Sequence, residues 1–260
     1  MQKTIVLIHG AWMTPTCWEP FISFFEKLGY RVLAPAWPYK ETSIEEQRKN
    51  PDPRLGTLGI KEIVDHYEKI IREEKEPPLL IGHSFGGLFV QMLLDRGVGS
   101  AGIAIDPAPP KGVFSFYPSV LWSLRLPLIT PFAWRKTLIW PFNHFQYAFV
   151  NTMPLEDQRR AYDTYAVPES GRIFWQAALM PILDAGKVNF KNSSRAPLLI
   201  IAGSKDHIVP AVINRSNFRK YKHSGAKTDF KEFSGRGHWI IAEPGWEEVA
   251  EYCHTWIQRL

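Results

Sequence analysis

The sequence predicts an α/β fold in which a mostly parallel sheet is covered by helices on both faces and carries an inserted, largely helical cap. Three observations support this prediction. Short aliphatic runs without polar alternation, typical of strands buried on both faces, recur along the chain. Segments with helical apolar spacing alternate with them over short connections. One long, aromatic-rich stretch interrupts this alternation before it resumes.

The first elements follow from apolar spacing and from the residues that stop them. TIVLI at 4–8 predicts a buried strand, and WEPFISFFEKLG predicts a helix that ends at Gly29. The helix places its apolar residues on one stripe, formed by Phe21, Phe24, Phe25 and Leu28. YRVLAPAWP at 30–38 predicts a second strand, which prolines halt, and the charged, turn-rich segment 41–56 predicts a loop.

The next elements surround a short turn that contains one serine. Apolar residues at helical spacing predict a helix over 58–74. PLLIG at 78–82 predicts another buried strand, FGGLFVQMLLDRG predicts a helix that ends at Gly97, and AGIAID at 101–106 predicts a fourth strand. This succession is typical of parallel strands joined by helical crossovers.

The alternation stops after residue 112. The stretch 113–190 holds 16 of the 35 aromatic residues in 78 of the 260 positions, together with prolines and irregular helical patches. The pattern then resumes with a strand at 197–203, a helix over 211–220, a strand at TDFKEF and a terminal helix. An insertion between two parts of one sheet is the simplest explanation. We therefore expect a core of residues 1–112 and 191–260 and a cap of residues 113–190.

Size and composition narrow the class of protein. A chain of 260 residues with 45% hydrophobic residues can bury a large core without disulfides. Its formal charge of +5 comes with 22% charged residues, close to the globular average, and with no basic cluster typical of nucleic-acid binding. The two cysteines, Cys17 and Cys253, fit reduced thiols in a cytoplasmic protein better than a disulfide framework, with a single bridge as the alternative.

Two further patterns concern secretion and membranes. The apolar run near the start is too short for the core of a signal peptide, so we expect a cytoplasmic protein unless a leader has been removed. The longest apolar stretch, 116–142, is interrupted by charges and prolines, namely Arg125, Pro127, Pro131, Arg135 and Lys136. Because a membrane-spanning helix needs about 20 uninterrupted apolar residues, we expect no stable membrane insertion.

The candidate nucleophile is Ser84. Gly82-His83-Ser84-Phe85-Gly86 matches the pattern G-x-S-x-G between a predicted buried strand and a predicted helix, the context that gives the pattern meaning. Such a turn is tight and strained, and the flanking glycines remove side chains that would collide with nearby backbone. The hydroxyl is then exposed at the carboxyl end of the sheet, above a helix N-terminus that favours negative charge. An ordinary polar turn is the alternative.

A serine hydroxyl needs a base, and the base needs an orienting acid. His238 lies in a glycine-flanked loop between the last strand and the final helix, a position that the other histidines lack. Asp206 lies three residues past a buried strand, and the chain order Ser84, Asp206, His238 is the one expected for a serine at a strand-to-helix turn. Asp106 ends the preceding strand at the same edge of the sheet and is the rival acid.

The attacked carbonyl oxygen needs two donors for its developing negative charge. The tetrapeptide HGAW at 9–12 follows the first strand and therefore reaches the same edge of the sheet as the serine. The backbone N–H groups of Ala11 and of Phe85, directly after the nucleophile, are the candidate oxyanion donors.

With these four elements the chain resembles the α/β-hydrolase superfamily, in particular its cofactor-independent branch of esterases, lyases and haloperoxidase-like enzymes. The resemblance covers 1–112 and 191–260, and the insertion is similar to that family's variable cap. It implies an α/β-hydrolase fold and a triad of Ser84, His238 and Asp206. It also implies that no metal or organic cofactor is required.

Single residues argue against some members of the superfamily. Haloalkane dehalogenases and epoxide hydrolases use an aspartate where this chain has Ser84. Hydroxynitrile lyases carry a threonine and a lysine where this chain has Gly10 and Trp239. The resemblance therefore implies a serine esterase and not a dehalogenase or a lyase.

The expected reaction is acyl transfer to water, in which a carboxylic ester or a lactone is cleaved through an acyl-enzyme. The aromatic cap predicts a large apolar pocket and a bulky substrate, such as a large ester or a macrocyclic lactone of the macrolide type. Five tryptophans are candidate substrate-binding residues, with plain core packing as the alternative: Trp12, Trp122, Trp140, Trp175 and Trp239.

Other functions stay open at this point. The same fold and triad serve C–C bond hydrolysis, perhydrolysis and acyl transfer to an alcohol. A receptor of hydrolase fold that binds small hydrophobic molecules without turnover is an alternative of a different class. A lipase that acts at interfaces through the segment 116–142 is another. In each case we expect a small-molecule partner and no nucleic acid.

Overall fold

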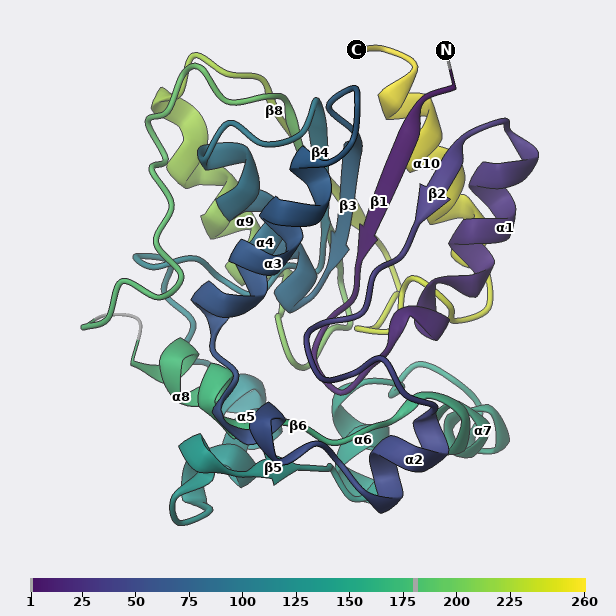
Figure 1. The fold of residues 1–260 in the computed structure, drawn as a ribbon, viewed down its shortest axis with the longest axis vertical. Coiled ribbons are helices and arrows are strands. Elements are labelled where there is room, and N and C mark those ends of the chain that lie inside the picture. Colours follow the sequence, from purple (N-terminus) through teal and green to yellow (C-terminus); the bar gives the residue numbers. More distant parts are fainter. Residues whose placement is uncertain (1, 180–181) are drawn as a thin grey trace.

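The computed structural model describes residues 2–179 and 182–260 and has a six-stranded parallel sheet at its centre (Figure 1). The strand order is β2-β1-β3-β4-β7-β8, and every neighbouring pair is parallel. The strands are β1 (Thr4–Ile8), β2 (Arg31–Leu33), β3 (Leu79–His83), β4 (Ala101–Ile105), β7 (Leu198–Gly203) and β8 (Thr228–Phe233). The predicted fold class is confirmed.

Helices cover both faces of the sheet. Figure 1 shows α1 and α10 on one side of the strands and α3, α4 and α9 on the other. Their bounds are α1 (Glu19–Lys27), α3 (Ile60–Arg72), α4 (Phe85–Asp95), α9 (Ala211–Lys220) and α10 (Trp246–Ile257). Two short 3-10 turns, η1 (Pro15–Trp18) and η4 (Tyr221–His223), flank α1 and α9. Because both faces are covered, every residue of β3, β4 and β7 is buried, as their unbroken aliphatic runs predict.

Two predictions about the first helix and second strand are corrected. Leu28, predicted on the buried stripe of α1, is 45% exposed because it lies just past the last turn of the helix. The strand predicted over 30–38 is only three residues long. Pro35 follows this short strand closely and cannot donate to a sheet.

The segment predicted as a loop contains a helix, α2 (Ile44–Lys49). The side chain of Ser43 caps it by accepting a hydrogen bond from the N–H of Glu46 at 3.2 Å. Acidic residues fill its first turn and basic residues its last, which complements the helix dipole. The dense charge that suggested a loop therefore stabilises a short helix.

The helices and short strands between Pro118 and Ala178 form a layer across the carboxyl ends of the strands (Figure 1). Its elements are α5 (Pro118–Ile129), η3 (Ala133–Arg135), β5 (Thr137–Leu138), α6 (Phe142–Ala148), α7 (Leu155–Tyr165), β6 (Glu169–Ser170) and α8 (Gly171–Ala178). The strands β5 and β6 pair antiparallel. The turn η2 (Pro53–Thr57) packs against β5, β6, η3 and α8, so a piece of the chain predicted as core lies in the cap layer.

Two predictions from composition can be compared with the described residues. No helix within 2–179 or 182–260 is long and apolar enough to cross a membrane. Cys17 and Cys253 are both buried and both free, so the single disulfide left open by the sequence is absent here.

The parallel sheet brings distant parts of the chain to one edge. The strands β1, β3, β4, β7 and β8 all end at this edge. The residues that follow them include, in the same order, Ala11, Ser84, Asp106, Asp206 and His238. Because ligands of α/β proteins bind at the carboxyl ends of parallel strands, this edge is the place to look for a site.

Candidate active site

Ser84 occupies a strained turn between β3 and α4. Its backbone angles are φ 57° and ψ −120°, outside the regions that side-chain-bearing residues normally adopt. A side chain at Gly82 would overlap the backbone of Gly86, and one at Gly86 would overlap the carbonyl of Ile8. The N–H of Ser84 donates to the carbonyl of Ile105 at 2.9 Å. Neighbouring strands therefore hold the turn that the sequence motif predicts.

His238 and Asp206 form a buried hydrogen-bonded pair. The Nδ1–H of His238 donates to Oδ2 of Asp206 at 2.6 Å, and both side chains are fully buried. The other oxygen of Asp206 accepts from the N–H groups of Ile208 at 2.7 Å and Val209 at 2.9 Å. Because the proton is on Nδ1 in this arrangement, Nε2 carries a lone pair, the state that a general base requires.

Nε2 of His238 makes no hydrogen bond within the described residues, and this includes the hydroxyl of Ser84. Catalytic hydrogen bonds are often long or poorly aligned until substrate binds, so this geometry is compatible with proton transfer from the serine.

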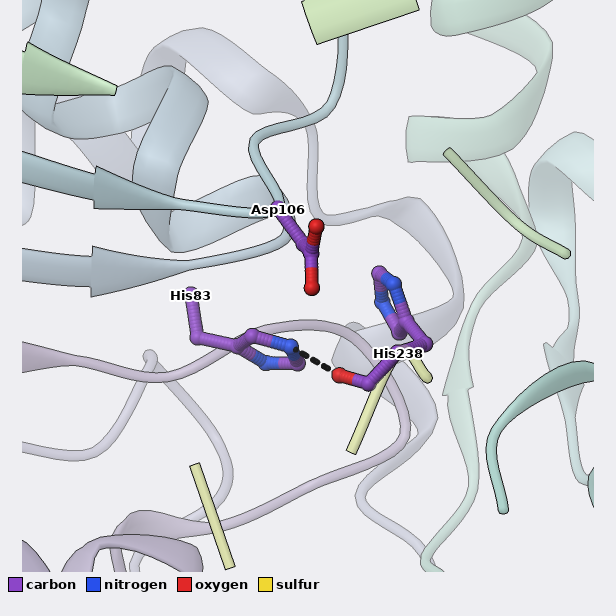
Figure 2. Close-up of side chains that lie close together, drawn as sticks. All are labelled: His83, Asp106 and His238. Carbon is purple, nitrogen blue, oxygen red and sulfur yellow. Dashed lines mark hydrogen bonds between the residues drawn. The ribbon is translucent and has the colours of Figure 1, made fainter. Parts of the chain in front are cut away.

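Three contacts hold the loop that carries His238. The Nε2–H of His83 donates to the backbone carbonyl of His238 at 2.8 Å, as Figure 2 shows. The N–H of Trp239 donates to the carbonyl of Phe149 at 3.1 Å, and the N–H of Gly237 donates to Glu243 Oε1 at 3.2 Å. The sequence motif alone assigned no role to His83, but in the structure His83 is hydrogen-bonded to the loop that carries His238.

Asp106, the rival acid, does not bond to the histidine. Its Oδ1 accepts from the N–H of Gly203 at 2.7 Å, and its Oδ2 has no partner within the described residues. Burial raises the pKa of Asp106 well above the usual value, and the nearby charge of Asp206 raises this pKa further. Of the two candidate acids, Asp206 is the one paired with His238.

His83, Asp106 and His238 lie close enough together to be considered as metal ligands (Figure 2). Each offers one ligand atom, and these atoms lie within 4.8 Å of one another. A zinc ion lies about 2.0–2.1 Å from each nitrogen ligand, so the ligand atoms around it must lie closer to one another than 4.8 Å. A carboxyl with a raised pKa favours its neutral form, which is a poor ligand. The residues therefore fit a metal poorly.

Within residues 2–179 and 182–260, the N–H groups of the two candidate oxyanion donors are free. Phe85 is the first residue of α4, so its N–H has no partner within the helix. The N–H of Ala11 makes no hydrogen bond with any described part of the chain. Both residues line one cavity together with Ser84. The candidate nucleophile and the two residues that carry the unused N–H groups thus line a common space, as acyl transfer requires.

This cavity has a volume of about 320 Å³ and a mainly apolar wall. Core and cap both contribute large apolar side chains, among them Val120, Leu124, Phe149, Phe174, Ile208 and Ile213. Within the described residues the wall contains no charged side chain, and its hydroxyls are those of Ser84 and Ser115. The apolar wall agrees with the prediction from the sequence. Ligand pockets span about 300–1,000 Å³, so the volume of this cavity is near the lower end of that range.

Of the five tryptophans predicted to bind substrate, the structure places only Trp12 in the described cavity wall. Trp122 is 53% exposed on α5. Trp140 stacks behind Trp12 with ring centroids 3.5 Å apart. Trp175 donates from Nε1 to the carbonyl of Pro127 at 3.0 Å, and Trp239 packs against Phe149 at the histidine loop.

The reason for this difference is the direction of the side chains. Composition predicts an aromatic-rich cap, but it does not tell which face of a cap element each ring occupies. Phe149 and Phe174, which line the cavity, carried no signal in the sequence that distinguished them from the other cap aromatics.

Comparison with known proteins places these observations in a family. The sequence profile described as "Alpha/beta hydrolase family" matches residues 5–252. The carbendazim hydrolyzing esterase of Nocardioides sp. (strain SG-4G) is 34% identical over 95 residues, which are 36% of this chain and 37% of that protein. The match therefore spans little more than a third of this curated relative.

Solved structures resemble the whole chain. The monoacylglycerol lipase of Paleococcus ferrophilus is 24% identical, with a TM-score of 0.68 over 97% of this chain and 93% of that chain. A pyrethroid hydrolase from Sphingobium faniae JZ-2 is 18% identical, with a TM-score of 0.67 over 98% of this chain and 97% of that chain. At these identities the likeness shows the fold.

Proposed function

Because the chain belongs to the alpha/beta hydrolase family, we propose that it is a serine hydrolase that cleaves neutral carboxylic esters with a compact apolar acyl group. The observation that carries this proposal is the position of Ser84, which lies in the wall of an apolar cavity together with Ala11 and Phe85, whose N–H groups have no partner within the described residues. The similar proteins are an esterase, a lipase and a pyrethroid hydrolase by name, which supports the same class of reaction.

The proposed reaction begins with proton transfer. Nε2 of His238 accepts the proton of the Ser84 hydroxyl, and Oγ attacks the ester carbonyl carbon. The N–H groups of Ala11 and Phe85 stabilise the negative oxygen that forms. Asp206 keeps the proton of the imidazole on Nδ1 and stabilises the imidazolium.

The second half of the reaction releases both products. The imidazolium gives its proton to the leaving alkoxide, and the carbon–oxygen bond of the ester breaks, which leaves an acyl group on Ser84. His238 then removes a proton from water, and the resulting hydroxide attacks the acyl carbon. Collapse of this second intermediate returns the proton to Oγ of Ser84 and frees the carboxylic acid.

The cavity supports a restriction on the substrate. Burial of a charged acyl chain against an uncharged wall costs several kcal/mol or more, so we expect neutral acyl groups. The volume of about 320 Å³ favours a single chain or ring over the macrocyclic lactone that the aromatic content of the cap suggested.

A labelling experiment tests the proposal. A fluorophosphonate probe should modify the wild type at Ser84, as identified by mass spectrometry of the labelled peptide, and should not modify Ser84→Ala. Equal labelling of both proteins would contradict the assignment of the nucleophile. A panel of p-nitrophenyl esters then compares acetate, butyrate, octanoate and the charged hemisuccinate. Faster cleavage of hemisuccinate than of butyrate would contradict the proposed substrate class.

A further inference from the structure

A fully buried ion pair joins the core to the cap beside the active site. Lys40, from the loop after β2, donates from Nζ to Oε2 of Glu169 on β6 at 2.6 Å, and both side chains have no exposed surface. Burial lowers the pKa of Lys40, and the charge of Glu169 opposes this effect. Buried ion pairs often add little stability compared with apolar residues of the same size, so stability alone does not explain this pair.

The carboxylate of Glu169 also binds the backbone next to a candidate oxyanion donor. The N–H of Trp12, the residue after Ala11, donates to Oε2 of Glu169 at 3.0 Å. The second oxygen, Oε1, accepts from the N–H of Ser170 at 2.8 Å. Glu169 therefore joins a core lysine, the cap backbone and the loop that follows β1.

Trp12 has an unusual backbone conformation that requires support. Its φ is 61°, in the left-handed region that bulky residues rarely adopt. Its carbonyl accepts from the N–H of Val167 at 3.0 Å, and its Nε1–H donates to the carbonyl of Leu138 at 3.2 Å. All three polar groups of Trp12 are thus bonded to the cap, whereas the N–H of the preceding residue, Ala11, has no partner among the described groups.

We propose that Glu169, held by Lys40, is a positioning residue: its carboxylate fixes the backbone of Trp12 and thereby orients the N–H of Ala11 toward the oxyanion. The inference rests on the proposed function, because this oxyanion forms only in acyl transfer. Because the N–H of Trp12 donates to Glu169, the N–H of Ala11 is the one of these two neighbouring groups that is left for the oxyanion. The cap is then part of the catalytic apparatus as well as a wall of the cavity.

Two double variants separate this role from the contribution of the ion pair to folding. Lys40→Met with Glu169→Gln removes both charges but keeps a carbonyl oxygen that can accept from Trp12. Lys40→Met with Glu169→Met removes both charges and the acceptor, with nearly the same side-chain volume. The two proteins differ in whether the side chain at 169 offers an oxygen that can accept from the N–H of Trp12 or of Ser170, and thermal unfolding checks that both are folded.

Steady-state kinetics with p-nitrophenyl butyrate provide the readout. We expect kcat to be about 10–100-fold lower in the methionine pair than in the glutamine pair, with KM unchanged, because a misplaced donor affects the transition state more than substrate binding. The rate of fluorophosphonate labelling should fall in parallel. Equal kcat in the two double variants would overturn the inference.

A third variant covers the case in which the methionine pair does not fold. Glu169→Asp keeps the charge opposite Lys40 but withdraws the oxygen from Trp12 by one methylene. We expect a lower kcat with unchanged KM, and a wild-type kcat would overturn the inference. If the wild type neither hydrolyses any ester of the panel nor is labelled at Ser84, the proposed function fails and the inference with it. A labelled, active wild type with equal variants contradicts the inference alone.

Discussion

Replacing Asp206 by asparagine should reverse the tautomer of His238. In the wild type, one oxygen of Asp206 accepts two backbone N–H groups and the other accepts the Nδ1–H of His238. The side-chain oxygen of an asparagine is needed by the two backbone donors, so its NH₂ group faces Nδ1. Because two donors cannot bond to each other, Nδ1 loses its proton and Nε2 gains one.

The size of the effect follows from this change. A histidine protonated on Nε2 cannot accept the proton of the Ser84 hydroxyl, and in a serine-protease triad the corresponding change lowers kcat about 10⁴-fold. This factor corresponds to about 5.4 kcal/mol of transition-state stabilisation. Asp106→Asn is the matched control, because an amide oxygen still accepts from Gly203 and because His238 is not bonded to Asp106. We expect this control to lose less than about tenfold.

The assay is the steady-state hydrolysis of p-nitrophenyl butyrate by the wild type, Asp206→Asn and Asp106→Asn, each checked by circular dichroism. KM should change little, because the acid does not line the described cavity. A greater loss of kcat in Asp106→Asn than in Asp206→Asn would refute the assignment of the acid and the reasoning from the hydrogen bonds.

Three further outcomes are expected. Val120→Phe places a larger side chain in the cavity wall, so it should lower kcat/KM for the octanoate ester by about tenfold or more and leave kcat/KM for the acetate unchanged. Trp122→Ala, on the exposed side of α5, should change neither value. Equal effects of the two variants would contradict the position of the cavity. Because the pKa of Asp106 is raised in the folded state, its neutral form stabilises the fold below the ordinary aspartate pKa, and this contribution is lost as pH rises through the folded-state pKa. Asp106→Asn should therefore raise Tm relative to the wild type by more at about pH 8 than at about pH 4. The opposite trend in differential scanning calorimetry would contradict the buried, uncharged state of Asp106. Dialysis against EDTA should leave kcat unchanged, since no proposed step uses a metal, and a loss that zinc restores would refute this.

The sequence predicted the strands of the central sheet and the motifs at their carboxyl ends because both depend on local patterns. A strand buried on both faces requires an unbroken aliphatic run, and a turn as tight as that of Ser84 requires glycines on either side. The predicted order of serine, acid and histidine follows from the order of parallel strands. Short stretches of sequence are therefore enough to predict these features.

Features that depend on the packing of distant segments carried no such signal. Lys40 lies in a region that composition describes as turn and charge, and Glu169 lies in a cap without a regular pattern. The two residues are 129 positions apart in the sequence, and they are buried because the fold brings β6 against the loop after β2. For the same reason, the sequence did not tell Phe174, in the cavity wall, from Trp122, on the surface.

The contacts between cap and core also restrict how a substrate reaches Ser84. The cap is bonded to the loop of Ala11 and Trp12 through Glu169 and to the loop of His238 through Phe149, so motion at either contact would disturb groups of the proposed reaction. Phe114, Phe116 and Leu121 line the cavity and yet are 60%, 52% and 48% exposed, which marks its mouth. This mouth lies at the start of the cap, away from both contacts along the chain. Because Phe114, Phe116 and Leu121 take no part in either contact, substitutions of these residues should change KM more than kcat.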